Sequence, residues 1–389
     1  MTTIQKMNLK NFDKSNWKLF KFHEIAYRIS ETVDPNTTEL DVYIGLEHID
    51  GENIHIKRYG TPADVSGGKL KCYPGDVIFG KRRAYQRKAA IVEFEGICSA
   101  HAFVFRANPV VIEPKLFPFF LHSDQFMDRA IDISVGGLSP TINWGDLKDQ
   151  EFLLPPKEEH AKLSELLWAM DEVIEKEKGV FENININKEA LQNLLFDKDK
   201  YSQTKLEKYA SILGGYAFSS DSFINEGVPV VKIKNIVEGS ISIEEKSNYV
   251  DVKIANMANK YLLYSGDILI AMTGATLGKI GVVQNTYDRA LLNQRVGKFE
   301  LKEGVNKFYM YGILDSQHFL RELNKYIGEG AQGNISAEDI SKTQVPYLTI
   351  EETNHFGGKF HRFSSALKEV KMKLQSSRSL QKSLINQVF

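Results

Sequence analysis

The densest group of side chains able to do chemistry is a basic stretch in the first half of the chain. Residues 81–88 read Lys-Arg-Arg-Ala-Tyr-Gln-Arg-Lys, so five cations fall within eight residues and no acid lies among them. Basic side chains release counterions from phosphate, and arginine and glutamine also match the edges of guanine and adenine. The stretch is therefore a candidate for contact with double-stranded DNA through Lys81, Arg82, Arg83, Tyr85, Gln86, Arg87 and Lys88.

The same stretch also has a purely structural interpretation, which stays open at this point. A basic loop can be solvated and balanced by nearby acids such as Glu93 and Glu95. The whole chain has a formal net charge of −1, so bulk composition gives no argument for nucleic acid and any such argument must be local. The choice between a DNA contact and a solvated loop therefore depends on how the rest of the chain is organised.

The sequence carries no persuasive catalytic or metal-binding motif. Gly274–Lys279 is similar to a phosphate-binding loop, but it has one residue too few between its glycines and Ile280 where a hydroxyl belongs. Asn108–Pro109 matches only the first half of the Asn-Pro-Pro-aromatic motif of amino-methyltransferases. The nine histidines show no zinc spacing, and Cys72 and Cys98 lie 26 residues apart. We therefore expect no catalytic residue, no metal and no cofactor in this chain.

Length and composition bound the class of protein. The chain has 389 residues, enough for two to four domains, and its 42% apolar and 25% charged residues are ordinary for a soluble globular protein. Two cysteines are too few for a disulfide framework and indicate a reducing cytoplasm. Apolar runs such as Leu116–Leu121 are far too short for a membrane span. We therefore expect a cytoplasmic protein with no membrane partner.

The two halves of the chain are related to each other. Three segments recur: Tyr73–Ile78 (YPGDVI) as Tyr264–Leu269 (YSGDIL), Ile142–Leu147 (INWGDL) as Ile335–Ile340 (ISAEDI), and Leu191–Phe196 (LQNLLF) as Leu384–Phe389 (LINQVF). The last shift is 193 residues, about half the chain, which is too long for the repeat of a solenoid. It indicates two copies of one domain, and two related domains suggest a ligand with two related halves.

The second copy has a less charged counterpart of the basic stretch. Ala271–Lys279 follows the same Gly-Asp strand and offers Thr273, Thr276 and Lys279. This difference fits two domains that read different sequences, and it also fits a second copy that makes no contact here. The further DNA-binding candidates are Gln294 and Arg295, Ser139 and Thr141 in the loop Gly136–Thr141, and Gln332 and Asn334 in the loop Gly328–Asn334. Such loops can bring backbone donors close to phosphate, or they can be plain connectors.

Short apolar runs separated by turns predict a mixed α/β domain in each copy. The expected strands are Val42–Leu46, Asp76–Phe79 and Ala102–Phe105 in the first copy, and Val230–Ile233 and Asp267–Ile270 in the second. A helix is expected at 115–131 in the first copy and another at 306–326 in the second. These elements would hold the candidate loops at the ends of strands.

Two long helices are predicted, one after each domain. In the first, one seam passes through Leu163, Met170, Glu177, Ile184 and Leu191, and the other through Leu166, Val173, Val180, Asn187 and Leu194, so that eight of the ten positions are apolar. The C-terminal stretch repeats the pattern with Phe360, Phe363, Leu367, Val370, Leu374, Leu380, Leu384 and Val388. Chain order would make the helices antiparallel, with a globular domain at each end of a rod ~60 Å long. Two ordinary core helices of a bundle are the alternative.

These features together resemble the specificity (S) subunit of type I restriction-modification systems over essentially the whole chain. The matching segments are Tyr43–Ile49, Gly75–Tyr85, Gly266–Ile270, Gly274–Gly278 and the junction Leu154–Pro156 that leads into Glu158 and Glu159. The second junction, Val345–Thr349, departs from the pattern because it lacks the double proline. The resemblance implies target recognition domains at 1–156 and 201–349, alternating with long antiparallel coiled-coil helices at 157–200 and 350–389.

The resemblance also implies a function. Such a chain has no catalytic activity of its own and reads a gapped, two-part DNA target on behalf of its partners. Two methyltransferase subunits would use S-adenosylmethionine to methylate adenine, and a restriction subunit driven by ATP with Mg²⁺ could then join. Three alternatives remain: an enzyme with an unrecognised motif, a coiled-coil scaffold with two peptide-binding domains, or the recognition part of another methyltransferase-type defence system.

Overall fold

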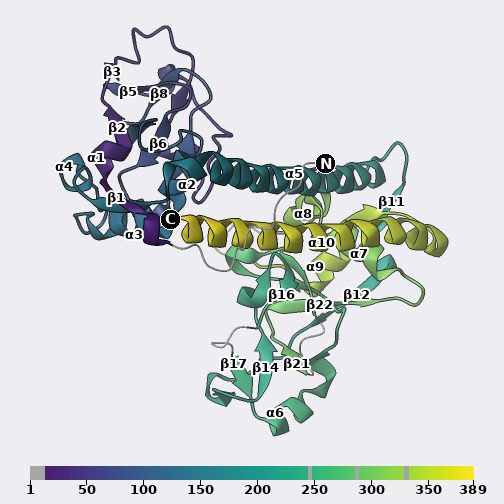
Figure 1. Cartoon of the computed structure of the whole chain (residues 1–389). Coiled ribbons are helices and arrows are strands. Elements are labelled where there is room, and N and C mark those ends of the chain that lie inside the picture. Colours follow the sequence, from purple (N-terminus) through teal and green to yellow (C-terminus); the bar gives the residue numbers. More distant parts are fainter. Residues whose placement is uncertain (1–13, 244–247, 285–288, 328–332) are drawn as a thin grey trace, which may run out of the picture. The chain divides into compact units, whose positions relative to one another are not determined.

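The computed structural model describes residues 14–243, 248–284, 289–327 and 333–389. It divides the chain into two compact units, one formed by Met1–Lys178 with Met372–Phe389 and the other by Gly179–Lys371. Two long helices, α5 (Lys157–Leu195) and α10 (Ile350–Val388), each contribute one half to each unit. Every unit therefore combines a globular α/β domain with a piece of both helices (Figure 1).

The first unit contains two four-stranded sheets and a short ribbon. One sheet has the order β2 (Ala26–Ile29), β9 (Ala102–Ala107), β6 (Val77–Gly80), β7 (Ala89–Ile91), and all its pairs are antiparallel. The other has the order β3 (Thr32–Val33), β5 (Lys69–Cys72), β8 (Gly96–Cys98), β4 (Tyr43–Ile44), and its β4–β8 pair is parallel. The ribbon joins β1 (Lys18–Lys21) to β10 (Glu151–Leu154), just before α5 begins.

The second unit repeats this plan and enlarges it. Its first sheet has six strands: β12 (Ala210–Gly214), β22 (Val296–Leu301), β19 (Ile268–Ala271), β20 (Ile280–Val282), β16 (Gly239–Ile241) and β15 (Ile236–Val237). Its second sheet has five: β13 (Phe223–Ile224), β17 (Asn248–Val250), β14 (Val228–Val231), β21 (Ala290–Leu292) and β18 (Leu262–Leu263). The ribbon pairs β11 (Gln203–Lys205) with β23 (Gln344–Pro346).

The strand pairing confirms the predicted pair of mixed α/β domains. The antiparallel series β9–β6–β7 returns as β22–β19–β20, and the parallel pair β4–β8 returns as β14–β21. Even the backbone conformation of the turn before the central strand is the same, because Gly75 and Gly266 both have φ 89°. Only glycine adopts such an angle readily, which explains why the Gly-Asp pair recurs in the sequence.

The single helices predicted at 115–131 and 306–326 are each broken in two. The first is α2 (Phe117–His122) followed by α3 (Asp124–Asp132), and the second is α7 (Lys307–Leu314) followed by α8 (Gln317–Asn324). The break falls on a serine each time, Ser123 or Ser316, whose side-chain oxygen accepts a hydrogen bond from the amide three residues later. Serine is a preferred N-cap because its hydroxyl satisfies a free amide of the first turn. Four shorter helices are α1 (Phe22–Ile25), α4 (Trp144–Leu147), α6 (Val252–Met257) and α9 (Ala337–Lys342).

Both long helices are continuous over 39 residues, which corresponds to ~59 Å at 1.5 Å per residue. The helix α5 begins directly after Pro155–Pro156, whereas α10 lacks a double proline and uses a capping box instead. There the Thr349 amide donates to Glu352, and the Glu352 amide donates to the Thr349 hydroxyl. The two junctions therefore start equivalent helices by different local means.

The faces that these helices bury differ in part from the predicted heptad seams. Leu163, Leu167 and Ile174 are buried, whereas Val173 and Val180 are each 49% exposed and Leu380 is 59% exposed. The predicted seam through Val173 and Val180 is therefore wrong. A helix of this kind packs on its own globular domain as well as on another helix, so one apolar period cannot describe every buried position.

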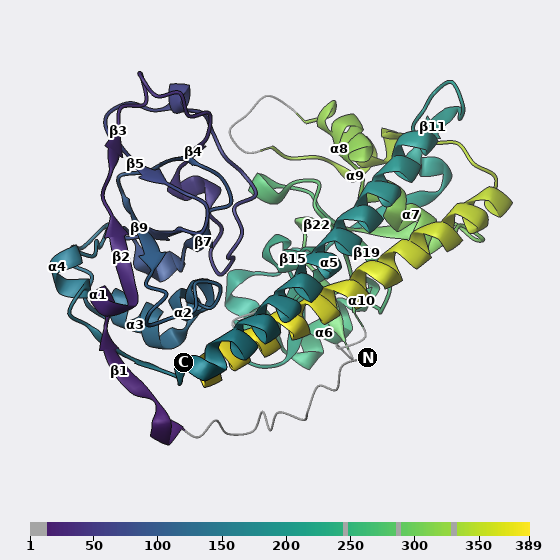
Figure 2. The same cartoon turned by 45° about the horizontal axis from the view of Figure 1, so that its top comes forward.

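Each unit pairs opposite ends of the two helices. In the first unit, the start of α5 lies beside the end of α10 (Figure 2). There Leu163 and Leu167 of α5 share a core with Leu384 and Val388 of α10. In the second unit, Leu195 near the end of α5 shares a core with Phe360 near the start of α10. This is the antiparallel pairing that chain order predicts. Among the described residues, none of the helices has both the length and the apolar character needed to cross a bilayer.

Candidate nucleic-acid interface

The basic stretch forms a closed loop between β6 and β7. The loop is closed by a hydrogen bond from the Gly80 amide to the Lys88 carbonyl, at 2.9 Å. A short 3-10 turn, Ala84–Gln86, lies inside it. The residues on either side of this turn, Arg83 and Arg87, have left-handed backbones with φ 57° and 51°. Two non-glycine residues in this strained region within one loop indicate that side-chain contacts hold its shape.

The structure brings a second predicted segment, Gly136–Thr141, against this loop. The Arg83 amide donates to the Pro140 carbonyl at 2.7 Å, and the Ile142 amide donates to the Lys81 carbonyl at 2.9 Å. Between these two bonds, Arg82 and Thr141 form an antiparallel bridge. The Arg83 side chain also donates from Nε to the Ser139 hydroxyl at 3.2 Å. Two segments more than fifty residues apart in the sequence therefore form one surface.

We call a pair of loops bridged in this way, here 81–88 and 136–141, a bracket. The second unit builds an equivalent bracket from different residues. The Ala271 amide donates to the Lys279 carbonyl at 3.0 Å and closes the loop. The Gly274 amide donates to the Gly333 carbonyl, and the Ile335 amide donates to the Met272 carbonyl, both at 3.0 Å. Thr273 and Asn334 form the antiparallel bridge between them. Here the left-handed positions that match Arg83 and Arg87 are occupied by Gly274 and Gly278, with φ 73° and 81°. Gln332, another predicted candidate, lies outside the described residues.

Four side chains of the first loop are exposed, and a fifth is held on an aromatic ring. Arg82, Arg83, Tyr85 and Gln86 are exposed to solvent. The Lys81 ammonium lies 5.1 Å from the centre of the Phe103 ring, and the Arg28 guanidinium lies 5.5 Å from the same ring. Burial and the nearby Arg28 charge lower the pKa of Lys81. Sequence analysis missed Arg28, because a single arginine on a strand gives no local signal of its position beside the loop.

The last two cations of the stretch point into the protein. The side chain of Arg87 is only 17% exposed and forms ion pairs with Asp124, Glu52 and Asp128 at 2.6, 3.5 and 3.7 Å. The Lys88 ammonium donates to the Leu46 carbonyl at 2.5 Å. Within this loop, Arg82 and Arg83 are therefore the cations that remain exposed to solvent, and Lys81 is partly exposed.

The acids that balance this region are different from those expected. Glu95 pairs with Lys71 at 2.8 Å, and Glu93 lines a small hollow with His55 and Lys57. The carboxylates that neutralise part of the loop are Glu52, Asp124 and Asp128, all gathered around Arg87. A fully balanced solvated loop therefore describes Arg87 but not Arg82 and Arg83.

The bracket of the second unit presents mainly neutral polar groups. Lys279, Gln294, Arg295 and Asn334 are exposed, and Thr273 is partly buried. The Met272 amide donates to the Arg295 carbonyl at 3.0 Å, which places Gln294 and Arg295 beside the bracket as predicted candidates. The hydroxyl oxygen of Thr276 is buried and has no hydrogen-bond partner among the described residues. This candidate therefore faces the interior of its loop.

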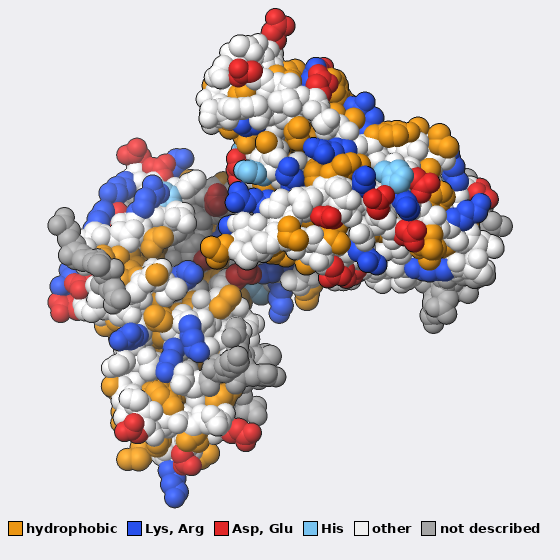
Figure 3. Space-filling view, turned by 90° about the vertical axis from the view of Figure 1, so that its left-hand side faces the viewer, with side chains coloured by type: hydrophobic (Ala, Val, Ile, Leu, Met, Phe, Trp, Pro, Cys, Tyr) orange, Lys and Arg blue, Asp and Glu red, His pale blue; other side chains and the backbone are white. Residues whose placement is uncertain are grey.

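On the face that Figure 3 draws, charge is distributed in patches rather than as one basic field. Figure 3 shows a face on which Lys and Arg side chains occur in several separate groups, with acidic side chains between them. This agrees with the net charge of −1 and makes the arginines of individual loops the relevant cations. Within the described parts of the chain, no group of three or more His, Cys, Asp or Glu side chains is arranged to hold a metal ion.

Comparison with known proteins points to one family. Residues 199–372 match the family model described as "Type I restriction modification DNA specificity domain". The chain is 28% identical over 220 residues to the type I restriction enzyme MjaVIII specificity subunit of Methanocaldococcus jannaschii, and this alignment covers 51% of the chain and 52% of that relative. It is 26% identical over 188 residues to the EcoBI specificity subunit of Escherichia coli, covering 48% of the chain and 37% of the relative. The chain thus spans about half or less of these curated relatives.

Solved structures share the fold over the full length. A crystal structure of the type I restriction-modification S subunit from M. genitalium has a TM-score of 0.61 and 15% identity, covering 100% of this chain and 99% of that chain. A chain from a structure of type I R-M complex assembly and conformational transition has a TM-score of 0.56 and 17% identity, with coverages of 96% and 97%. At these identities the similarity establishes the fold alone.

Proposed function

We propose that the chain is a specificity subunit of a type I restriction-modification system and that it reads a gapped, two-part DNA target, because residues 199–372 match the model of the DNA specificity domain and curated specificity subunits are similar to the chain. The observation that supports this most is the bracket of two loops that occurs once in each unit. Both brackets have the same backbone hydrogen bonds, whereas their exposed side chains differ. Two equivalent frames with unlike side chains suit a target whose two halves differ in sequence.

In the first domain, Arg82 and Arg83 would supply the strongest readout. An arginine can bind guanine through two hydrogen bonds, and a glutamine such as Gln86 can do the same with adenine. Tyr85 is 54% exposed beside them and can contact a base or a sugar. In the second domain, Arg295, Gln294 and Asn334 would read bases, and Lys279 would contact phosphate. A mismatched base pair in either half should cost ~1–3 kcal/mol.

The long helices would set the unread spacer between the two half-sites. Each helix is continuous over 39 residues and contributes residues to both units. Under this proposal the two helices would act as a rigid linkage between the two reading domains. Rigid linkage raises the effective concentration of the second domain at its half-site once the first has bound. Weak contacts to each half can then sum to a specific complex.

The chemistry of modification and restriction would belong to partner subunits. Two methyltransferase subunits would bind S-adenosylmethionine, flip one adenine in each half-site and methylate it. A restriction subunit that uses ATP and Mg²⁺ could complete the assembly. Calorimetric titration of the purified chain with S-adenosylmethionine tests this division of labour, because measurable binding would favour an enzyme over a specificity subunit.

Lengthening the helices tests the proposed spacer. Four extra residues, about one turn, inserted in the middle of α5 with a matching insertion in α10, add ~6 Å, which corresponds to about two base pairs. We expect the complex with its methyltransferase to recognise the same two half-sites with a longer gap between them. An unchanged gap would show that the helices do not set the spacing.

A further inference from the structure

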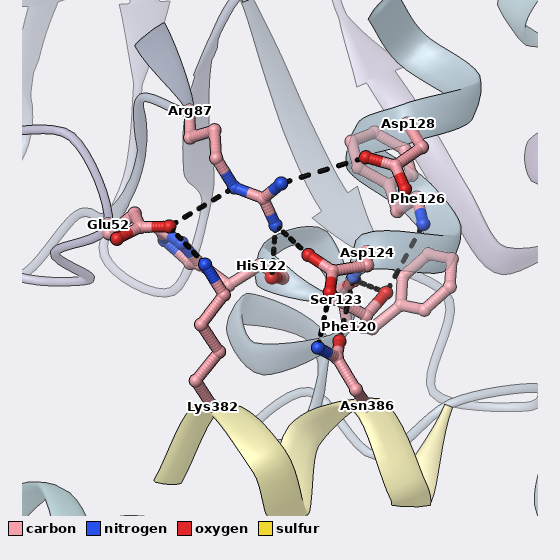
Figure 4. Close-up of polar contacts among 10 residues, drawn as sticks. All are labelled: Glu52, Arg87, Phe120, His122, Ser123, Asp124, Phe126, Asp128, Lys382 and Asn386. Carbon is pink, nitrogen blue, oxygen red and sulfur yellow. Dashed lines mark hydrogen bonds and ion pairs between the residues drawn. The ribbon is translucent and has the colours of Figure 1, made fainter. Parts of the chain in front are cut away.

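A polar network joins the base of the first reading loop to the C-terminal end of α10 (Figure 4). Arg87, at the end of the loop, is paired with Glu52, and the same Glu52 oxygen lies 2.6 Å from the Lys382 ammonium. Arg87 also pairs with Asp124, whose backbone amide donates to the Asn386 side chain at 2.8 Å. Two acids therefore connect one loop residue to two residues on a single face of α10.

Arg87 has a backbone conformation that is energetically unfavourable for any residue with a side chain. Its backbone is left-handed with φ 51°, and the matching residue of the second unit is Gly278 with φ 81°. Glycine adopts this conformation freely, whereas a residue with a Cβ atom does so only when other contacts hold it. At Arg87 those contacts are three carboxylates and the His122 carbonyl, which accepts from Nη2 at 3.2 Å. The side chain is thus committed to the protein interior.

We infer that Arg87 is a positioning residue that fixes the reading loop of the first domain onto α10, so that Lys382 and Asn386 influence how the first half-site is read. The inference rests on the proposed function, since it concerns the loop that would carry Arg82 and Arg83. This contact runs against chain order. Lys382 and Asn386 follow the second domain in sequence, yet they lie in the first unit and act on the first domain.

Electrostatics explains why the network acts as a unit. Arg87 and Lys382 together neutralise most of the charge of Glu52, Asp124 and Asp128. The hydrogen bond from Lys382 and the charge of Arg87 hold the pKa of Glu52 below its ordinary value, so Glu52 stays ionised between them. Removal of either cation leaves carboxylates that repel one another next to the loop. The base of the loop, and with it the bracket that carries Arg82 and Arg83, is then free to shift.

The second unit offers a matched control because one of the long helices contacts its globular domain there through other residues. There Lys188 of α5 pairs with Asp315 at 2.6 Å, and Asn193 lies 2.6 Å from the ring of His318. The loop itself has Gly278 in place of Arg87. Changing Lys188 to Met should therefore loosen a helix contact without altering the first reading loop.

The test compares Arg87→Gly, Lys382→Met and Lys188→Met in the complete chain bound to its methyltransferase partner. Glycine at position 87 preserves the left-handed backbone while removing the side chain. Binding is measured on the full target and on duplexes with either half-site scrambled, at several salt concentrations. We expect Arg87→Gly and Lys382→Met to weaken discrimination at the first half-site about 10-fold and to leave the second unchanged. The salt dependence should stay that of the wild type, since neither side chain contacts phosphate.

Three results would decide against the inference. A salt slope reduced by about one in Arg87→Gly would make Arg87 a phosphate contact. An equal loss of discrimination at both half-sites in Arg87→Gly or Lys382→Met would show that the network only stabilises the fold. A loss of discrimination at the first half-site in Lys188→Met would show the same. Unaltered discrimination in Arg87→Gly, with the wild type specific for its target, would overturn this inference alone. Failure of the wild-type complex to bind any gapped target would overturn the proposed function together with it.

Discussion

The loops 81–88 and 272–279 share a backbone and differ in almost every side chain. Both loops are closed by the same hydrogen bond, both have two left-handed residues at matching positions, and both form a bridge to the loop before α4 or α9. In the first loop the left-handed residues are arginines, and in the second they are glycines. The comparison shows that the backbone frame of these loops does not depend on which exposed side chains they carry. The frame depends on backbone hydrogen bonds, so the exposed side chains can change without loss of the fold.

The comparison is tested most strongly by removing the exposed arginines of the first loop. The double change Arg82→Ala with Arg83→Ala should weaken binding about 100-fold, equivalent to ~3 kcal/mol, because two base or phosphate contacts are lost. The loss should be confined to the first half-site, measured by fluorescence anisotropy on duplexes with one half-site scrambled. Lys18→Ala, which removes an exposed cation of β1, serves as the control and should bind as the wild type does. Unchanged binding of the double variant would exclude the loop as a reader.

A second difference between the units predicts a pH effect on the stability of the first one. His122 lies under the loop at the place occupied by Asp315 in the second unit, and its ring lies 2.7 Å from the Ala89 carbonyl. Burial, together with the Arg87 charge, lowers the pKa of His122 to about 4, although the hydrogen bond to the Ala89 carbonyl and the charges of Glu52 and Asp171 oppose the shift. The unfolded chain then binds a proton at higher pH than the folded chain does. Stability is therefore complete above about pH 6.5 and declines as the pH falls toward 4.

The change between pH 6.5 and 5 should amount to about 2 kcal/mol of unfolding free energy in the first unit. Urea unfolding at a series of pH values measures it. His122→Gln keeps a donor for the Ala89 carbonyl but cannot titrate, so its stability should decline less steeply with acid than that of the wild type. Identical pH profiles for the two proteins would show that His122 does not titrate in this range.

A smaller effect on stability should distinguish Asp76 from Asp267, the aspartates of the recurring Gly-Asp pair. Asp76 is fully buried and accepts from the Arg106 guanidinium at 2.7 and 3.0 Å, while Asp267 is 22% exposed and lies 3.6 Å from Lys298. Replacing Asp76 with Ala should cost about 2 kcal/mol, because it strips a buried site of its acceptor. The same change at Asp267 should cost about 1 kcal/mol. Chemical unfolding of both variants measures the two losses of unfolding free energy. A larger loss at Asp267 than at Asp76 would contradict this account of the repeat.

The repeat and the long helices could be predicted because they rest on signals spread over many residues. Three recurring segments defined the two copies, and apolar residues at heptad-like spacing indicated each long helix. The breaks at Ser123 and Ser316 could have been found, since each serine stands at the same place in its copy. One helix-capping serine alone is a weak signal of a helix break. Two serines at equivalent positions, 193 residues apart, are a stronger signal.

The interface was harder to predict because exposure is decided by distant contacts. Nothing local distinguishes Arg83, which is exposed, from Arg87, whose side chain meets three acids from two other segments. In the same way, the bridge between Arg82 and Thr141 joins loops that the sequence could nominate only separately. The predicted burial of Val173 was wrong for the same reason, because α5 packs on its globular domain as well as on α10.

The most direct test of the two-reader account is methylome sequencing of cells that carry this chain and its methyltransferase partner. We predict that methylated adenines define one motif with two unlike halves separated by a fixed gap. In cells with the Arg82→Ala, Arg83→Ala variant, only one of the two halves should become degenerate. A contiguous motif, or a methylation pattern that does not depend on the chain, would contradict the account.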